Sequence, residues 1–277
     1  MARRVAFVNN KGGVGKSTTT VRLAEGLAKE GKRVLVVDMD PQGNASSMLG
    51  WFYDSERPQP TISQAIKADT EGAARSVVQP IGWEAPYAER IALAPAILTL
   101  ENRMAEAGVD GAWRRLDTAL EGVDDSFDYT LLDCPPSVFH LTQLALAAAH
   151  DVVIVTEADI YAVEAAERMR DFVTVRARRN LANPTLELRG VVINALTTTA
   201  VQAEQRDSIR RIFGDLVWDP TIKHRTTLAE AGTDALPLTS PRAAEPRASY
   251  ELLTATFLVG RHAAQAMLAP GTPGAIV

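Results

Sequence analysis

Residues 9–18 read NNKGGVGKST and follow a short apolar run, VAFV. The segment ends in G-K-S-T, which fits the second half of the phosphate-loop pattern G-x-x-x-x-G-K-[ST], but an asparagine stands where that pattern has its first glycine. A helical pattern comes next, and a strand, a glycine-rich turn and a helix are the context in which this motif binds phosphate. The stretch therefore predicts a phosphate-binding loop with a second lysine, Lys11, in addition to Lys16.

The residues of this loop are expected to act together on a nucleotide. Its glycines let the backbone turn so that N–H groups point inward at phosphate oxygens, and the following helix adds its positive end. We expect Lys16 to reach the β- and γ-phosphates and the Ser17 hydroxyl to ligate Mg²⁺. The predicted nucleotide-binding residues of the loop are Lys11, Gly12, Gly13, Val14, Gly15, Lys16, Ser17 and Thr18.

Aspartates stand at the ends of two other apolar runs. RVLVVD ends at Asp38, with Asp40 two residues on, and DYTLLD ends at Asp133. Ligands bind at the carboxyl ends of parallel strands, and an apolar strand that ends in aspartate is typical of the Walker B carboxylate. Ser17 and Asp133 are therefore predicted metal residues, and Asp38 and Asp40 are expected to meet them at the same edge of the sheet. Taken singly, each aspartate could instead form a turn or cap a helix.

The base of the nucleotide is harder to predict. Asn194 ends the apolar run RGVVIN, and its amide could donate to and accept from a purine. A turn or helix cap is an equally good interpretation of this residue. The chain contains no N-K-x-D or T-K-x-D guanine signature.

The order of apolar and helical patterns predicts the fold class. Apolar runs alternate with helical stretches, which favours an α/β fold with a doubly wound, mostly parallel sheet and helices on both faces. Besides VAFV, we expect strands at 33–38, 128–133, 151–156 and 189–194, and helices at 17–30, 141–150, 164–179, 202–213 and 249–268.

One segment interrupts this alternation. Residues 51–110 hold several prolines and the tryptophans Trp51 and Trp83, and we interpret them as an irregular excursion with short helices. We expect one domain over residues 1–277 and a flexible tail at 270–277.

Composition limits the possible function classes. The net charge of -5 gives no general attraction to nucleic acid, so any DNA binding requires a local basic patch. The one cysteine excludes a disulfide framework and a four-cysteine metal site. No apolar run reaches the roughly 18 residues of a membrane span, and the N-terminus does not resemble a signal peptide. We therefore expect a cytoplasmic protein with no membrane partner.

Four segments taken together carry a family resemblance. KGGVGKST, VLVVDMDPQGNAS, LLDCPPS and HRTTLAEA resemble the ParA family of DNA-partitioning ATPases, which belongs to the deviant Walker A class that includes MinD. The similarity is close over 3–49, good over 127–165 and loose over 186–237. The first motif alone would indicate only the class, whereas the combination is specific to the family.

The resemblance assigns roles around the nucleotide. It implies that two subunits sandwich two ATP molecules and that Lys11 crosses to the partner's nucleotide. It matches Asp40 to the water-positioning carboxylate and Asp133 to the Walker B residue, and it places Asp38 near Mg²⁺. The predicted catalytic residues are therefore Lys11, Lys16 and Asp40, and the predicted cofactors are ATP and Mg²⁺.

The resemblance also implies partners and a cellular role. The ATP-bound dimer of the family binds DNA without sequence preference, and a ParB-type centromere-binding protein stimulates otherwise weak ATP hydrolysis and releases it. This cycle segregates plasmids or chromosomes, so we expect an association with the nucleoid. The phosphate loop begins at about residue 10, which leaves no room for the N-terminal helix-turn-helix domain of larger relatives. The chain thus resembles the short form.

The DNA-binding residues are the weakest part of this match. Family arginines follow the strand matching RGVVIN, but the segment after Asn194 reads ALTTTAVQ and has none. A solvated, charged helix face is the alternative interpretation of Arg206, Arg210 and Arg211. The predicted DNA-binding residues are Arg206, Arg210, Arg211, Lys223 and Arg225.

Two other functions stay open at this stage. One is a metabolic P-loop ligase or kinase that acts on a small molecule, and the other is a ParA-like positioner of non-DNA cargo. D-x-D-P-Q-G-N together with Lys11 favours a partition ATPase over the first alternative. The second would use the same chemistry, and the sequence does not exclude it.

Overall fold

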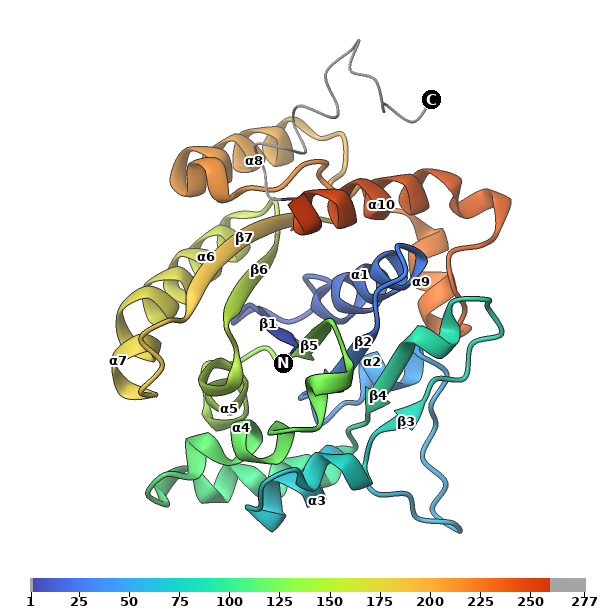
Figure 1. Cartoon of the computed structure of the whole chain (residues 1–277). Coiled ribbons are helices and arrows are strands. Elements are labelled where there is room, and N and C mark those ends of the chain that lie inside the picture. Colours follow the sequence, from blue (N-terminus) through green and yellow to red (C-terminus); the bar gives the residue numbers. More distant parts are fainter. Residues whose placement is uncertain (1, 260–277) are drawn as a thin grey trace.

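A seven-stranded sheet organises the chain in this computed structural model, which describes residues 2–259 (Figure 1). The strand order is β3-β4-β2-β5-β1-β6-β7, and every neighbouring pair is parallel except β3 with β4. The strands are β1 (Arg3–Val8), β2 (Val34–Asp38), β3 (Gln79–Pro80), β4 (Ile91–Ala94), β5 (Tyr129–Asp133), β6 (Asp151–Glu157) and β7 (Glu187–Asn194).

Helices cover both faces of this sheet, because successive residues of a strand point to opposite sides. Val5 and Phe7 pack in one buried cluster, and Ala6 and Val8 pack in another. The helices are α1 (Lys16–Lys29), α2 (Asn44–Met48), α3 (Ile62–Ala68), α4 (Arg115–Leu120), α5 (His140–Ala148), α6 (Ile160–Asp171), α7 (Arg178–Asn180), α8 (Ala200–Phe213), α9 (Thr226–Thr233) and α10 (Ala244–Val259).

The two buried clusters confirm the predicted fold class. The cluster of Val5 and Phe7 contains residues of α1 and α10, which lie side by side in Figure 1. The cluster of Ala6 and Val8 contains residues of α3, α4, α5, α6 and α8. The sheet is therefore doubly wound and mostly parallel, with one core on each side.

The segment 51–110 contributes more than the predicted irregular excursion. It contains α3 and several 3-10 turns, but it also supplies β3 and β4, and β4 pairs in parallel with β2. Trp83 anchors the segment because its indole nitrogen donates to the carbonyl of Met48 at 2.9 Å. The strand IALA was missed because it has four residues and only a short 3-10 turn directly before it.

Several helix boundaries also differ from the prediction. α6 begins at Ile160, and the helical path continues through a π-helix (Phe172–Ala177) into α7. α10 begins at Ala244, five residues before the predicted start at Ser249. The predicted end of this helix at Leu268 and the predicted flexible tail at 270–277 lie outside the described residues. Between residues 2 and 259, every helix is too short or too polar to cross a membrane.

Candidate nucleotide-binding site

The loop between β1 and α1 has the backbone of a phosphate-binding turn. Gly13 and Gly15 have φ angles of 77° and 85°, in the left-handed region that side chains disfavour. A Cβ atom added to Gly15 would lie 1.8 Å from Nδ2 of Asn194, whereas one added to Gly13 would meet no atom within 4 Å. Position 15 therefore requires glycine for both backbone and space. α1 begins directly after it and directs its positive end into the site.

An open cavity of about 540 Å³ lies over this loop. This volume falls within the range usual for small-ligand sites. Four parts of the chain line it: the phosphate loop with the start of α1, the segment 40–48, Pro136 after β5, and α9. The lining residues are Gly12, Gly13, Gly15, Lys16, Ser17, Thr18, Asp40, Gln42, Asn44, Ser47, Met48, Pro136, Leu228, Ala229, Gly232 and Thr233.

Lys16 is a nearly buried cation that lines this cavity. Only 6% of the residue is exposed, and its Nζ donates to the carbonyl oxygen of Lys11 at 3.3 Å. Burial lowers the pKa of Lys16, while the negative charges of Asp133 and Asp40 act in the opposite direction. Because burial disfavours the charged form, a phosphate group beside this ammonium would stabilise it. The position suits the predicted contact with phosphates.

Two buried carboxylates meet at the carboxyl edge of the sheet. Asp38 and Asp133 are paired residues on the neighbouring strands β2 and β5, and both are fully buried. Burial raises the pKa of Asp38 to about 6, although hydrogen bonds from Ser46 oppose the shift. Burial, and then the charge of Asp38, raise the pKa of Asp133 to about 8. Two like charges removed from water favour a cation between or beside them.

The two aspartates differ in the hydrogen bonds that they already accept. Oδ2 of Asp38 accepts from the backbone and hydroxyl of Ser46 at 2.8 and 2.7 Å, and its Oδ1 accepts from the backbone of Asp40 at 3.1 Å. Asp38 therefore holds the turn that carries Asp40 into the cavity. Oδ2 of Asp133, in contrast, is buried and accepts no hydrogen bond from the residues that the structure describes.

The residues at this edge of the sheet could supply part of the coordination shell of a magnesium ion. No group of three histidine, cysteine, aspartate or glutamate side chains within residues 2–259 could hold a metal alone. Mg²⁺ commonly takes only one or two protein carboxylates and completes its shell with phosphate oxygens and water. The unpartnered oxygen of Asp133 and the Ser17 hydroxyl, which lowers the pKa of Asp133, fit such an incomplete site. Asp38 fits a supporting role better than direct coordination.

Asp40, the predicted water-positioning residue, reaches the same cavity. It is 7% exposed, and its Oδ1 accepts a hydrogen bond from the backbone of Gln42 at 3.0 Å. Both residues belong to the turn between β2 and α2. The structure therefore brings Lys16, Ser17 and Asp40 to the lining of one cavity, and buries Asp133 beside Lys16 and Ser17 at the same edge of the sheet.

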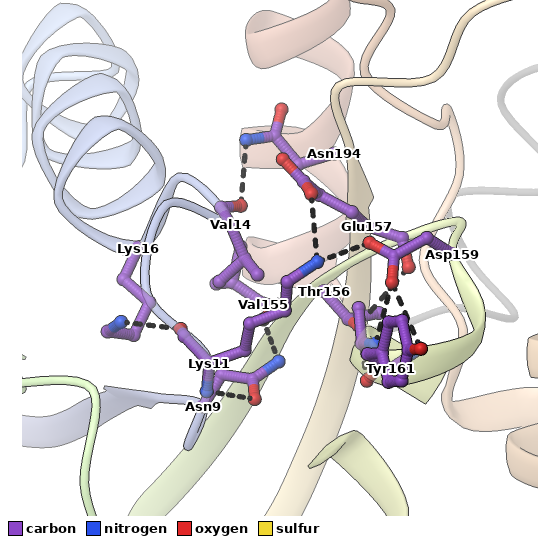
Figure 2. A network of polar contacts seen from close by, with 11 residues as sticks. Asn9, Lys11, Val14, Lys16, Val155, Thr156, Glu157, Asp159, Tyr161 and Asn194 are labelled. Carbon is purple, nitrogen blue, oxygen red and sulfur yellow. Dashed lines mark hydrogen bonds and ion pairs between the residues drawn. The ribbon is translucent and has the colours of Figure 1, made fainter. Parts of the chain in front are cut away.

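Lys11 points away from Lys16, as Figure 2 shows. Its Nζ donates to Oδ2 of Asp159 and lies 3.5 Å from Oε2 of Glu157. Burial lowers the pKa of Lys11, but the hydrogen bond and charge of Asp159, joined by Glu157, outweigh this effect and raise it above its usual value. Neither acidic residue was among the predicted site residues, although their place after the apolar run 151–156 indicates this edge of the sheet.

Asn194 contacts the phosphate loop rather than open space. Its Nδ2 donates to the carbonyl oxygen of Val14 at 3.0 Å, and the residue is 7% exposed (Figure 2). This bond ties the end of β7 to the loop. The predicted contact with a purine stays a prediction, and in the present arrangement the amide nitrogen is already engaged.

The predicted DNA-binding residues do not form a set of free cations. Four of the five pair with acidic side chains, and Arg211 donates to the Ser208 hydroxyl at 2.7 Å. Lys223 and Arg225 share one partner, Glu245, at 3.0 and 2.6 Å. Arg206 pairs with Asp207 at 2.7 Å, and Arg210 pairs with Asp219 at 2.5 Å. Their role in DNA binding stays a prediction.

The loop, the buried cation and the carboxylates on a doubly wound sheet define a P-loop nucleoside triphosphatase. A family model for an AAA domain, AAA_31, matches residues 2–188. The chain is 34% identical over 249 residues to the sporulation initiation inhibitor protein Soj of Bacillus subtilis, across 86% of this chain and 90% of that protein. It is 37% identical over 231 residues to the chromosome-partitioning ATPase Soj of Thermus thermophilus, across 83% and 84% of the two chains.

A third relative is the chromosome partitioning protein ParA of Caulobacter vibrioides, which is 34% identical across 85% of this chain and 86% of that protein. The chain belongs to the ParA family of ATPases, which confirms the resemblance seen in its motifs.

Solved structures agree with this fold. Cobyrinic acid a,c-diamide synthase from Mycobacterium smegmatis, with bound ADP and magnesium, has a TM-score of 0.74 at 27% identity and covers 94% of this chain and 97% of its own. A McdA variant of Cyanothece in complex with ATP has a TM-score of 0.80 at 20% identity, with 92% and 96% covered. The first of these proteins binds ADP and magnesium and the second binds ATP, and the cofactors predicted here are ATP and magnesium.

Proposed function

We propose that this chain is an ATP-driven dimerisation switch for DNA partitioning. It binds Mg-ATP, associates with a second copy, and binds duplex DNA without sequence preference as the dimer. A ParB-type partner then stimulates ATP hydrolysis and releases the protein from DNA. The proposed location is the cytoplasm, in association with the nucleoid.

The observation that carries this proposal is the divergence of the two loop lysines. Lys16 is directed into its own cavity, while Lys11 lies on the other side of the loop, with a side chain that is 32% exposed. A second ammonium that does not face its own nucleotide is suited to the nucleotide of a neighbouring subunit. Membership of the ParA family, with partitioning proteins among the relatives, supports this interpretation.

The residues of the cavity suggest how ATP would be cleaved. Lys16 and the backbone N–H groups of the loop would hold the β- and γ-phosphates, with Ser17 and Asp133 available to magnesium. Bound Mg²⁺ would neutralise charge on these phosphates. Asp40 would orient the attacking water. The turn that Asp38 anchors would hold Asp40 in place. Lys11 of the second subunit would add positive charge beside the nucleotide of the first subunit. This contact would couple the nucleotide state to assembly.

A substitution at Asp40 tests this division of roles. Asp40→Ala should bind ATP but lose hydrolysis, so that a dimer accumulates. The measurement is phosphate release with and without duplex DNA and a candidate partner protein, together with the oligomeric state. Normal hydrolysis by this variant would contradict the role assigned to Asp40.

Two other functions are distinguished by the same assay. The neighbour that synthesises a diamide favours, as a second candidate, a ligase acting on a small carboxylic acid. Activity that depends on a small acceptor, and not on DNA with a partner, would support it. A ParA-like positioner of non-DNA cargo would show stimulation by an adaptor protein without DNA. The relatives at 34–37% identity weigh toward partitioning.

A further inference from the structure

Both lysines of the phosphate loop form polar contacts with other residues of the same chain. Lys11 lies between Glu157, the last residue of β6, and Asp159, the residue before α6 (Figure 2). β6 is hydrogen-bonded to β1, so the ends of the two strands bring the carboxylates next to the loop. The pairing of β1 with β6 therefore places these two carboxylates beside Lys11.

The backbone around this contact is fixed on both sides. Oδ1 of Asp159 caps α6 by accepting hydrogen bonds from Tyr161 and Ala162, each at 3.0 Å. On the other side, Oδ1 of Asn9 accepts from the backbone N–H of Lys11 at 3.0 Å, and its Nδ2 donates to the Val155 carbonyl at 2.7 Å. Asp159 is therefore a positioned acceptor rather than a freely moving surface side chain.

A second contact connects the two lysines. Nζ of Lys16 donates to the carbonyl oxygen of Lys11. A nucleotide that draws Lys16 toward its phosphates would break this hydrogen bond and free the Lys11 peptide. Binding in the subunit's own cavity would in this way loosen the residue that must reach the other subunit.

We propose that Glu157 and Asp159 form an internal latch, which holds Lys11 within its own subunit until nucleotide binding and a partner's triphosphate release it. This inference rests on the proposed function, because it assumes that Lys11 acts on a second subunit. It adds a regulatory role for two carboxylates: they compete with the partner's phosphates for the same ammonium group.

The exposure of the latch indicates that it can open. The side chains of Lys11, Glu157 and Asp159 are 32%, 26% and 34% exposed. Ion pairs with this access to water stabilise proteins weakly, and a triphosphate offers more negative charge than two carboxylates. The pKa of Lys11 is raised, although burial acts to lower it. Burial acts to raise the pKa of Asp159, but hydrogen bonds from Lys11 and the α6 backbone lower it. Both shifts agree with an ion pair that is formed but can exchange partners.

Asp159→Asn tests the latch with little change to the fold, because asparagine keeps the oxygen that caps α6 but loses the charge. Because both subunits must release Lys11 when a dimer forms, the effect of one latch on the dimer Kd is squared. A three- to fivefold effect per latch, about the size of an exposed ion pair, predicts a dimer Kd lower by about 10- to 25-fold with a non-hydrolysable ATP analogue. Glu157→Gln should act in the same direction. Sedimentation equilibrium over a range of protein concentrations measures the Kd.

The matched control is Glu164→Gln, which removes one carboxylate from the exposed face of α6, where its partner among residues 2–259 is Arg168. Its dimer Kd should equal that of the wild type. A Kd for Asp159→Asn and Glu157→Gln that is unchanged, or higher than the wild-type value, would overturn the latch.

A second readout does not require dimerisation. In the nucleotide-free monomer, the rate at which acetic anhydride modifies Lys11, relative to the exposed Lys67, should rise in Asp159→Asn and stay constant in Glu164→Gln. An unchanged rate would show that the carboxylates do not restrain Lys11. If the wild type never dimerises with ATP, the proposed function fails, and this labelling experiment decides separately whether Glu157 and Asp159 hold the lysine.

Discussion

The two lysines of the phosphate loop lie only five residues apart but have different surroundings. Lys16 is nearly buried, whereas the Lys11 side chain is about one-third exposed and faces two carboxylates. A buried ammonium is costly without an anion, while a partly exposed one can exchange partners at small cost. This difference in environment supports the proposal that Lys16 binds the nucleotide of its own subunit and that Lys11 acts on the nucleotide of a second subunit.

Glycine substitutions test the shape of the loop. Gly15→Ala should weaken nucleotide binding more than Gly13→Ala, because its Cβ would lie 1.8 Å from Nδ2 of Asn194 and displace this amide from the Val14 carbonyl, and because its φ of 85° is strained for alanine. Gly13→Ala, with a similar φ but open space, is the matched control and should cost only about 1–2 kcal/mol of stability. The measurement is the affinity for a fluorescent ATP analogue, together with the Tm. Equal affinities for the two variants would contradict the account of this contact.

Asp133 gives a prediction about pH. Its folded pKa of about 8 lies above the value of about 3.9 for an unfolded aspartate, so the folded state binds the proton more tightly between these values. The free energy of unfolding contributed by this group is therefore lost as pH rises from about 4 to about 8. In buffer without metal or nucleotide, Asp133→Asn should be more stable than the wild type at pH 8 by about 1–3 kcal/mol, and the difference should vanish near pH 4.

The measurement for Asp133 is the free energy of unfolding in urea across this pH range, with ATP hydrolysis assayed in parallel. The variant should lose hydrolysis while it gains stability, as expected for a charge that is placed for function. A variant that is less stable at pH 8, or a difference that does not change with pH, would contradict the account.

Much of this site could be predicted at the residue scale. Lys16, Ser17, Asp40 and Asp133 come from local motifs, because each motif joins a strand end to a turn with fixed spacing. The partners of Lys11 were not predicted, because Asp159 is 148 residues away and meets it only through the pairing of β1 with β6. The engagement of Asp38 by Ser46 was missed for a related reason, since it depends on how the turn into α2 closes.

At the scale of elements, the basic residues before α9 are tied to α10. Lys223 and Arg225 both pair with Glu245, which lies at the start of α10. Any phosphate that binds there must compete with this carboxylate. The sequence indicated the cations but not the acid, because Glu245 lies 20 residues beyond Arg225 in the chain.

Glu245→Gln should therefore strengthen the retention of DNA by the ATP-bound protein. Freeing two cations for phosphate contacts would steepen the slope of log affinity against log salt by up to about 1.8 on duplex DNA. Arg225→Glu should have the opposite effect and leave nucleotide binding unchanged. Glu251→Gln, also on α10, is the matched control. Fluorescence anisotropy with labelled duplex DNA at several salt concentrations measures the slope, and an unaltered slope in Glu245→Gln would exclude both cations from the DNA interface.

The strands of the sheet differ in how well they can be predicted from the sequence. Those bordered by helices were predicted because β-branched runs alternate with helical patterns over long stretches. β4 was not, because its four residues lie between two 3-10 segments and carry no periodic signal of their own. Its place beside β2 is decided by tertiary pairing. The excursion at 51–110 thus widens the sheet rather than only covering it.

At the scale of the whole molecule, the sheet gathers the functional groups on one edge. The ends of β1, β2, β5, β6 and β7 carry, in that order, the phosphate loop, Asp38, Asp133, Glu157 and Asn194. An edge that combines an open cavity with a partly exposed lysine fits the proposed pairing with another copy of the chain. The family relationship and this geometry together support assembly that depends on nucleotide.

The most direct test of this central claim is sedimentation velocity with a non-hydrolysable ATP analogue, on the wild type and on Lys11→Ala. The account predicts that the wild type is a monomer without nucleotide and a dimer with it. Lys11→Ala should bind the analogue and remain folded, yet stay a monomer. A wild type that remains a monomer at saturating analogue, or a Lys11→Ala variant that dimerises as readily as the wild type, would contradict the account.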